Sequence, residues 1–425
     1  MSLHPPLKQV SPSKKITSFH PPQRTLMGPG PSDINPRVLA AMSLPAIGYL
    51  DPIFVGMMEE LKTLLRYAYQ TDNALTFPVS GPGSVGMETC FVNAVSPGDK
   101  VIVGRNGVFG GRMIENVERA GGTAIVVDAE WGEPIDPNRV EDAFKKNPDT
   151  KILAFVHAET STGCQSDAKT LAAIAHKHDA VSIVDAVTSL GGTPVLVDAW
   201  GIDAVYSASQ KCISCTPGLS PVSFSERFLD RVKTRGGKEN RVHSWFMDLN
   251  LVMNYWGNTN RTYHHTAPTN SLFALHESLL VLKEEGLENA WARHQRHHLA
   301  LKAGLEAMGI KYLVKEGNRL PQMNAVFVPE GLAVGGEAEV RKILLNEFNL
   351  EIGAGLGPLA GKIWRFGLMG YSCKAENVML CLSALGSVLS DMGLAVKVGD
   401  AEAAAHHAYA EQHKQDAIKK TKLAA

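Results

Sequence analysis

Short apolar segments alternate with helix-forming segments over much of the chain, and this alternation constrains the fold more than any other feature. Strands of this kind, apolar on both faces and separated by helices, are typical of a mostly parallel sheet covered on both sides. The sequence therefore predicts an α/β fold. The expected strands are 101–103, 124–127, 152–156, 181–184 and 204–206, after one that ends near Val79. The expected helices include 55–69, a segment ending at Val95, 112–120 and 168–178.

The pattern changes after residue 285, which predicts more than one domain. A long helix at 270–285 precedes a mixture of helices (288–308, 337–348) and short strands. We expect a large domain over residues 25–285, a smaller α+β C-terminal domain over 286–398 and a C-terminal helical tail over 399–425, with the tail solvated. Residues 1–24 hold four basic residues and no acid, and we expect an arm that lies over a partner subunit. A transit peptide is the alternative, although prolines interrupt its amphipathic helix.

Charge and hydrophobicity exclude several partner classes. The 42 basic and 43 acidic side chains nearly cancel, which argues against a nucleic-acid binder. No apolar run approaches the roughly eighteen residues of a membrane span, so we expect no membrane partner. The six cysteines are expected to be reduced and packed, as in a cytoplasmic protein, and Cys212–Cys215 lacks the second ligand pair that a zinc site needs. The Lys-Leu-Ala-Ala ending is not a Ser-Lys-Leu signal, while organellar import stays open.

An acid and a lysine follow two neighbouring predicted strands. Asp185 ends the strand in Ser-Ile-Val-Asp-Ala-Val, and Lys211 follows the next strand in Tyr-Ser-Ala-Ser-Gln-Lys. A pyridoxal phosphate site needs a lysine to bind the cofactor aldehyde and a carboxylate to keep the pyridine nitrogen protonated. A solvated loop lysine is the alternative. The spacing favours the cofactor site.

A glycine-rich turn between a strand and a helix predicts a phosphate site. In the segment 80–86, Ser-Gly-Pro-Gly-Ser-Val-Gly, the N–H groups of Gly83, Ser84 and Val85 are expected to point at an anion at the helix N-terminus. The segment also matches GxGxxG, the dinucleotide pattern. However, residues 103–106 offer no acid to bind a ribose, which favours a lone phosphate.

Ordered motifs over residues 25–395 resemble one enzyme family. Taken together, they resemble the class V, fold-type I pyridoxal phosphate aminotransferases, of the alanine–glyoxylate and serine–glyoxylate type. The motifs are GPGP at 28–31, SGPGSVGME, GVFGGR, HAETSTG, VDAVTSLGG, SASQK, RTYHHTAP and GLGPLAGKIWRFGLMG.

The resemblance implies a set of site residues. Lys211 and Asp185 match the catalytic lysine and the pyridinium partner, and Arg365 matches the arginine that binds the substrate α-carboxylate. A surface salt bridge is the alternative for an isolated arginine. The implied cofactor-binding residues are Val187 and Phe109 on the two ring faces, Thr160 near the ring 3-oxygen, Gly83, Ser84 and Gln210 at the phosphate, and Tyr263 and Thr266 from the neighbouring subunit. The active site is therefore expected to form only in a homodimer.

Three positions depart from the family pattern. Pro82 lacks the N–H donor that some relatives have as serine, and Ser84 stands where animal alanine–glyoxylate enzymes carry histidine. Phe109 offers less stacking area than the tryptophan of many relatives. The departures at Pro82 and Ser84 bear more on the choice of substrate than on the cofactor.

The resemblance implies a transaminase that moves an amino group from alanine or serine to glyoxylate, giving glycine and a 2-oxo acid. Serine–pyruvate and pyridoxamine–pyruvate transfer are alternatives within the family. A cysteine desulfurase would need a reactive cysteine, for which Cys373 is poorly placed. The glycine turn alone supports a nicotinamide-dependent dehydrogenase, and a non-catalytic cofactor-binding protein is a further alternative.

Two histidine groups invite a metal interpretation. His264 and His265 are adjacent and would face opposite ways in a strand, which opposes shared coordination. His294, His297 and His298 lie among Arg and Gln on a helix that we expect to be exposed, so they are predicted to be solvated. The sequence thus predicts no metal site.

Overall fold

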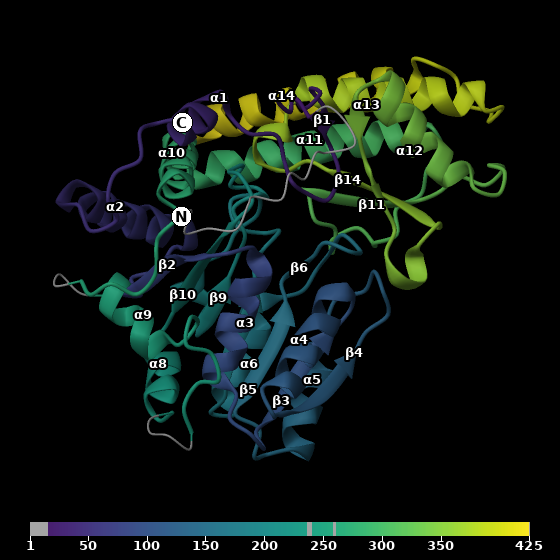
Figure 1. The fold of residues 1–425 in the computed structure, drawn as a ribbon. Helices are drawn as coiled ribbons and strands as arrows, with labels where there is room; N and C mark the ends of the chain where they lie inside the picture. Colours follow the sequence, from purple (N-terminus) through teal and green to yellow (C-terminus); the bar gives the residue numbers. More distant parts are fainter. Residues whose placement is uncertain (1–15, 236–239, 258–260, 425) are drawn as a thin grey trace, which may run out of the picture.

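The computed structural model describes residues 16–235, 240–257 and 261–424, with side chains up to residue 415 (Figure 1). Its central sheet has seven strands, which lie in the order β2, β10, β9, β8, β5, β3 and β4. Only β10 runs antiparallel to its neighbours. The predicted α/β fold with a mostly parallel sheet is confirmed. The strands are β2 (Leu75–Ser80), β10 (Leu219–Phe224), β9 (Ala204–Tyr206), β8 (Val181–Asp185), β5 (Ile152–Val156), β3 (Lys100–Arg105) and β4 (Thr123–Asp128).

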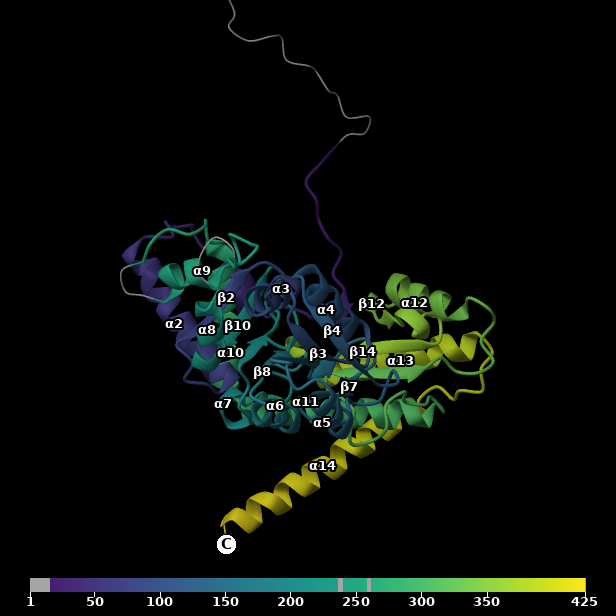
Figure 2. The same cartoon turned by 90° about the horizontal axis from the view of Figure 1, so that it is seen from below.

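Helices cover both faces of this sheet. Helices α3 (Gly83–Ala94) and α4 (Val108–Arg119) lie on one face, and α5 (Pro137–Lys146) and α6 (Ala168–Lys177) lie on the other (Figure 2). The strands β8 and β5 are buried along their whole length, as expected for a sheet covered on both sides. The remaining elements of this part are α1 (Pro36–Met42), α2 (Pro52–Tyr69), β6 (Ala158–Glu159), β7 (Cys164–Gln165), α7 (Val197–Trp200), α8 (Glu226–Lys233), α9 (Leu249–Trp256) and α10 (Thr269–Glu285).

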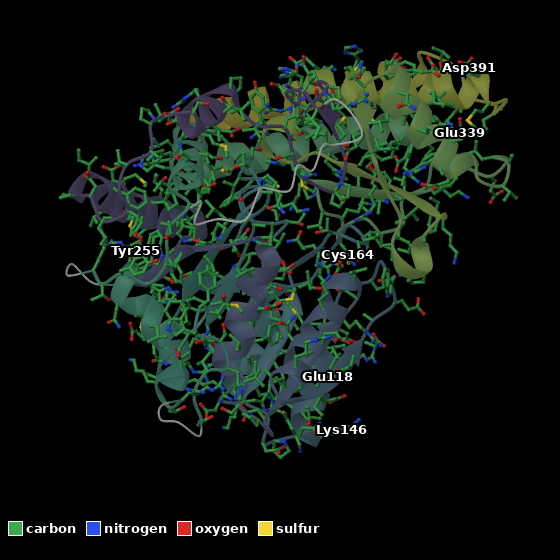
Figure 3. All side chains as sticks on the ribbon, in the orientation of Figure 1. Glu118, Lys146, Cys164, Tyr255, Glu339 and Asp391 are labelled. Atoms are coloured by element: carbon green, nitrogen blue, oxygen red, sulfur yellow. The ribbon has the colours of Figure 1, made fainter. Side chains whose placement is uncertain are left out.

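A second hydrophobic cluster forms around a three-stranded antiparallel sheet. Trp364 and Phe366 of β14 (Ile363–Gly367) lie at its centre and are fully buried. Figure 3 places Glu339 and Asp391 in this part, far from Glu118 and Lys146 of the first, with Cys164 between them. The other elements are α11 (Leu287–Ala307), β11 (Met323–Phe327), α12 (Gly336–Glu347), β12 (Leu350–Glu351), β13 (Gly353–Ala354), the 3₁₀ turns η1 (Gly357–Leu359) and η2 (Gly370–Ser372), and α13 (Ala375–Asp391).

The first strand of the chain joins this second cluster. β1 (Thr25–Leu26) pairs in parallel with β12, and Met27 is fully buried among the residues of the second cluster. A few residues later, the N–H of Ser32 donates to the carbonyl of Gln210 at 2.9 Å. The segment 25–32 therefore connects the two clusters. The division of the chain into the domains named above stays a prediction.

The predictions for the C-terminal helices need correction. His294, His297 and His298 were expected to be solvated, yet they are 0%, 9% and 5% exposed. Their ring nitrogens find buried partners: His294 with the Ala290 carbonyl at 2.7 Å, His297 with the Tyr409 hydroxyl at 2.7 Å, and His298 with the Asn324 side chain at 2.6 Å. Hydrogen bonding makes burial of these polar rings tolerable.

The tail helix α14 (Asp400–Ala424) is packed over its first turns rather than wholly solvated. Ala401 and Ala405 are buried in the second cluster, and Tyr409 contacts α11 through His297. The Gln412 side chain still donates to the Arg296 carbonyl of α11 at 3.2 Å, and past it the helix extends away from the body (Figure 2). None of the helices among the described residues has the length and hydrophobicity that a membrane span requires.

Candidate active site

Asp185 and Lys211 lie at the carboxyl-end edge of the central sheet, where ligands of such sheets bind. Asp185 is the last residue of β8, and Lys211 follows β9 in the connection to β10. Asp185 is buried and Lys211 is half-buried, and the two charges interact. The Lys211 amine donates to the carbonyl of Pro29. The structure thus brings together the acid and the lysine that the sequence singled out.

The Asp185 carboxylate is held by two hydrogen bonds and shielded from water. Oδ1 accepts from the Val187 N–H at 2.8 Å, and Oδ2 accepts from the Tyr206 hydroxyl at 2.8 Å. Asp185 is 2% exposed, and its burial raises the pKa of the carboxyl from 3.8 to about 7, against the lowering effect of these two bonds. A cationic N–H partner in the site would therefore strongly favour the ionised form.

Burial also makes the Lys211 amine a better nucleophile. It lowers the pKa of the amine from 10.5 to about 8, so an appreciable fraction is unprotonated near neutral pH. Gly30 packs directly against this amine. Its φ is +112°, and a Cβ at this position would lie 2.5 Å from Lys211 Nζ. Only glycine fits here, because a side chain would displace the lysine.

The turn that opens α3 offers two backbone donors. Pro82 is its N-cap and makes no side-chain capping bond, so the first-turn N–H groups of Gly83 and Ser84 point out of the helix. The Val85 N–H donates to the Pro82 carbonyl at 2.8 Å, so the prediction that it faces an anion is wrong. A Cβ on Gly83 would lie 3.3 Å from Val187, which places this turn beside the Asp185 loop.

Gln210 carries an unsatisfied polar atom in the same region. Its side-chain Oε1 is buried and has no hydrogen-bond partner among the described residues. A carboxamide also carries an N–H₂ group, so rotation of the Gln210 amide lets this position present an N–H donor to an anion. A buried group without a partner is costly in a folded protein, which fits a ligand-binding role.

The predicted ring contacts line the same edge. Val187 is half-buried and bonded to Asp185, and Phe109 is half-buried in the first turn of α4. Thr160 lies in the turn after β6, where its hydroxyl hydrogen-bonds that of Thr188. An aromatic ring, a branched side chain and a hydroxyl are therefore available around the Asp185–Lys211 pair.

Arg365 projects from the centre of β14 into the region between the two clusters. It is 5% exposed, so the alternative of a surface salt bridge is excluded. Nε donates to the Ala354 carbonyl at 2.7 Å, and Nη1 donates to the Thr160 carbonyl at 3.1 Å. Burial lowers the pKa of the guanidinium to about 10, which still leaves it charged at neutral pH. Its fork geometry suits bidentate binding of a carboxylate.

Tyr263 and Thr266 are not brought against the α3 turn. Both are exposed, and the Tyr263 hydroxyl lies 3.4 Å from the Thr266 hydroxyl. Their neighbours His264 and His265 do not form a strand, and the two Nδ1 atoms lie 2.9 Å apart, so the expectation of opposite faces is wrong. The described residues contain no group of three or more His, Cys, Asp or Glu arranged to hold a metal ion.

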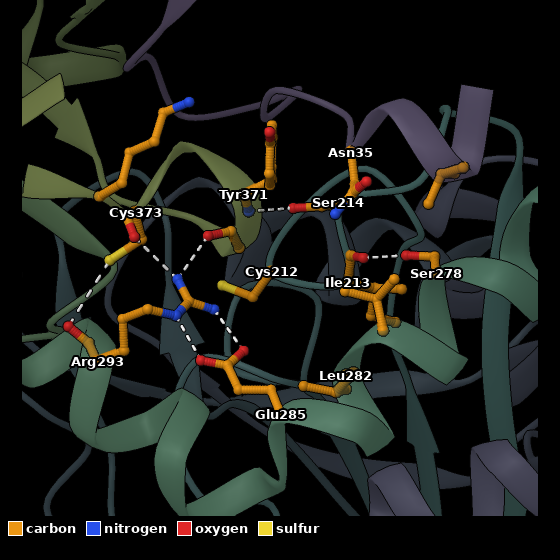
Figure 4. Close-up of a pocket in the computed structure, with 14 residues that line it drawn as sticks. Asn35, Cys212, Ile213, Ser214, Ser278, Leu282, Glu285, Arg293, Tyr371 and Cys373 are labelled. Carbon is orange, nitrogen blue, oxygen red and sulfur yellow. Dashed lines mark hydrogen bonds and ion pairs between the residues drawn. The ribbon is translucent and has the colours of Figure 1, made fainter. Parts of the chain in front are cut away.

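A separate cavity of about 370 Å³ is lined in part by residues 212–214, which follow Lys211 in the chain (Figure 4). Cys212 and Cys373 line it, and the Arg293 guanidinium pairs with Glu285 at 2.6 Å and donates to the carbonyls of Gly370 and Cys373. Burial raises the pKa of the Cys373 thiol. A buried thiol with a raised pKa is a poor nucleophile, which argues against a desulfurase role.

Sequence reasoning missed two residues at this site. Tyr206, the hydrogen-bond donor to Asp185, pairs directly with it across β8 and β9. Glu159 is fully buried beside Thr160. The available signals were the tyrosine at the end of a predicted strand and the glutamate in the HAETSTG motif.

The chain matches known proteins over most of its length. The family model "Aminotransferase class-V" matches residues 54–376. The (S)-ureidoglycine–glyoxylate transaminase of Bacillus subtilis is 38% identical over 93% of this chain and 98% of its own, and its crystal structure superposes with a TM-score of 0.89. The alanine–glyoxylate aminotransferase of Mus musculus is 38% identical over 87% of this chain and 88% of its own. The crystal structure of an alanine–glyoxylate aminotransferase from Nostoc sp. is 42% identical over 88% of this chain and 98% of its own, with a TM-score of 0.85.

The residues present fit the cofactor of these enzymes, pyridoxal 5′-phosphate. The site offers a buried amine, a buried carboxylate, two first-turn N–H groups and an unsatisfied amide, all of which suit the groups of that molecule. The sequence match and the shared fold agree with this chemistry. The chain belongs to the class V aminotransferase family, the pyridoxal phosphate-dependent transaminases.

Proposed function

We propose that the protein transfers an amino group from a small amino acid, alanine or serine, to glyoxylate, giving glycine and a 2-oxo acid. The relatives that are 38% and 42% identical support glyoxylate as the acceptor, because their names include it. The observation that carries the proposal is the buried Lys211 amine beside the buried Asp185 carboxylate. No other pair of groups at this edge supplies both a nucleophile and a partner for a pyridine nitrogen in the described residues.

Pyridoxal phosphate supplies an aldehyde that takes up the amino group and a ring that accepts electrons from the substrate Cα. In our proposal, Lys211 would hold the cofactor through its aldehyde, and its free amine would take the proton from the substrate Cα. Asp185 would hold the ring nitrogen in its protonated form. A positioned base contributes about 10²–10⁴-fold to such a reaction.

Other side chains bind and orient. We assign the cofactor phosphate to the N–H groups of Gly83 and Ser84 and to the Gln210 amide. Phe109 and Val187 are assigned to opposite faces of the ring, and Thr160 to its 3-oxygen side. The support is that these groups lie around one edge of the sheet and that the Gln210 amide lacks a protein partner.

Arg365 is assigned to the substrate α-carboxylate. Its guanidinium is buried and pairs with backbone carbonyls, which leaves N–H groups for a bidentate ligand. A carboxylate bound here is fixed relative to Lys211, so the proton to be removed is fixed as well.

The amino donor has one further candidate. (S)-ureidoglycine is named for the Bacillus subtilis relative, which is 38% identical over 93% of this chain. The structure named pyridoxamine–pyruvate aminotransferase is only 24% identical, so it supports the fold alone. Single-turnover loss of the cofactor absorption band near 400 nm with alanine, serine or (S)-ureidoglycine identifies the donor. Return of the band with glyoxylate or pyruvate identifies the acceptor.

We further propose that the protein is a homodimer in which Tyr263 and Thr266 reach the neighbouring subunit's phosphate site. Exposed apolar side chains near this segment support a covered surface, namely Leu39, Leu44, Leu50, Ile53 and Trp245. Lys211→Ala and Thr266→Ala homodimers should each lose activity, and mixing them under exchange conditions should restore part of it. Hybrids would contain one intact site. No recovery in proven hybrids would contradict a shared site.

Borohydride reduction followed by peptide mapping tests the central assignment. The pyridoxyl label is expected on Lys211 and should be absent from Lys211→Arg. A label on another lysine, or none, would refute the proposed function.

A further inference from the structure

Glu159 is a buried carboxylate at the candidate site that the proposed reaction does not use. It ends β6 and is 0% exposed. Its oxygens accept from the Phe109 N–H at 3.2 Å, from the Ser161 N–H at 3.1 Å and from the Ser161 hydroxyl at 2.5 Å. Burying a carboxyl group costs free energy unless hydrogen bonds such as these compensate for it, so a buried acid at this position needs an explanation.

The first of these bonds reaches the N-terminus of α4. Gly107 is the N-cap of this helix and has no side chain to cap it. The Val108 N–H donates instead to the Ser161 hydroxyl at 3.1 Å, and the Phe109 N–H donates to Glu159. Glu159 and Ser161 thus satisfy first-turn donors of a helix that begins about fifty residues earlier. A negative charge there also interacts favourably with the helix dipole.

Packing leaves no room for a local cap. A Cβ at position 107 would collide with the Glu159 side chain and with the Ser161 hydroxyl. The glycine therefore lets the carboxylate approach the helix end closely. The result is a fixed junction between the β6 turn and the first turn of α4.

That first turn carries Phe109. The backbone N–H held by Glu159 belongs to the same residue whose ring we assign to the cofactor. The guanidinium of Arg112, which follows Phe109 by three residues in α4, lies over that ring at 4.8 Å from its centre. Moving the first turn would therefore move the ring directly.

Burial raises the pKa of Glu159 above its ordinary value, and the hydrogen bonds from Ser161 and Phe109 partly oppose that rise. The charge also reaches Arg365, which donates to the carbonyl of the adjacent Thr160, and it opposes the lowering of the arginine pKa by burial. Glu159 thus interacts both with Phe109, which we assign to the cofactor ring, and with Arg365, which we assign to the substrate carboxylate.

We propose that Glu159 is a positioning residue: its carboxylate caps α4 in place of Gly107 and so holds the Phe109 ring against the cofactor. The inference rests on the proposed function, because it takes the ring contact of Phe109 from there. It adds a residue that touches neither cofactor nor substrate.

The test is a double-mutant cycle in the holoenzyme. Glu159→Ala should raise the cofactor dissociation constant by roughly 5- to 30-fold, as expected for losing a cap and a charged hydrogen bond. It should also reduce the circular dichroism of the cofactor band near 400 nm, which reports ring orientation. In a Phe109→Ala background, Glu159→Ala should raise the cofactor dissociation constant by less than about 3-fold, because the effects of two residues that act through one another do not add.

Two further variants guard against misfolding and a general loss of stability. Glu159→Gln keeps an acceptor oxygen and should lie between wild type and alanine in both readouts. Ser225→Ala is the matched control, since Ser225 caps α8 through the Phe228 N–H at 3.1 Å, at the opposite edge of the sheet. It should lower thermal stability without changing the cofactor dissociation constant or the band.

Two results would overturn the positioning role of Glu159. One is an equal rise in the cofactor dissociation constant when Glu159→Ala is made in the wild type and in Phe109→Ala; the other is an unchanged dissociation constant and circular dichroism in Glu159→Ala. These results would leave the proposed function standing if borohydride still labels Lys211 in the wild type. A wild type without the label would instead refute the proposed function.

Discussion

Asp185→Asn should abolish transamination and yet stabilise the cofactor-free protein at alkaline pH. Burial raises the pKa of Asp185 from 3.8 to about 7, so the unfolded chain releases this proton at a lower pH than the folded protein. Between these values the folded state binds more protons, and the free energy of unfolding falls as the pH rises. At about 1.4 kcal/mol per pKa unit, the free energy of unfolding is lower than at strongly acid pH by roughly 2 kcal/mol at pH 5 and by roughly 4 kcal/mol at pH 8.

Asparagine has no charge to bury, so it removes this pH-dependent loss. The stability difference between variant and wild type should therefore grow by about 2–3 kcal/mol in favour of the variant from pH 5 to pH 8. Urea unfolding at fixed protein concentration, followed by tryptophan fluorescence, measures it. Constant costs of the substitution, such as weaker bonds to Val187 and Tyr206, cancel in this comparison. Asp72→Asn, at an exposed position, should follow the wild-type profile. A difference that stays flat or reverses with pH would refute the reasoning.

Three other substitutions test neighbouring contacts. Arg365→Lys should raise KM for amino donors about 10- to 100-fold with a smaller effect on kcat, because a bidentate partner becomes a point charge; steady-state kinetics showing the reverse would contradict the assignment. Tyr206→Phe should slow the single-turnover half-reaction about 10-fold or more, since Asp185 loses a hydrogen bond worth about 1.5–3 kcal/mol; an unchanged rate would remove Tyr206 from the site. His294→Ala should lower the free energy of unfolding by about 2–4 kcal/mol, because the Gly370 N–H loses its buried acceptor at 2.9 Å. The exposed His413→Ala is its control and should unfold as wild type does.

The strands that could be predicted are those whose mostly apolar side chains indicate that the strand is buried. β5 is apolar throughout, and β8 is apolar except for Ser182 and its last residue, Asp185; both were predicted at or near their observed limits. β10 was missed because Ser220, Pro221 and Ser223 interrupt its apolar run. These residues are buried all the same, since Ser220 donates to the Ser207 carbonyl at 2.6 Å and Ser223 shares a hydrogen bond with Thr76 at 2.9 Å. Composition alone does not report such pairings.

The same limit applies to the helices and the site. Periodicity placed α11 correctly, but a polar ring such as His298 looks solvent-facing until its partner Asn324, far along the chain, is known. At the candidate site, Lys211 and Asp185 could be singled out because the proposed chemistry requires those residue types at strand ends, and the structure brings the two together. Glu159 and Tyr206 could not, because their roles come from contacts across neighbouring strands and helices.

The pairing of β1 with β12 has a consequence for how the protein is made. Arg24 hydrogen-bonds the Asn349 side chain, 325 residues away, next to that pairing. A ribosome releases the first of these residues long before the second exists, so the segment that packs Gly30 on Lys211 must wait through most of synthesis. Contacts this distant form late and slowly. The segment that encloses the Lys211 amine is thus expected to take its place late in folding, after the strands of the central sheet have been synthesised.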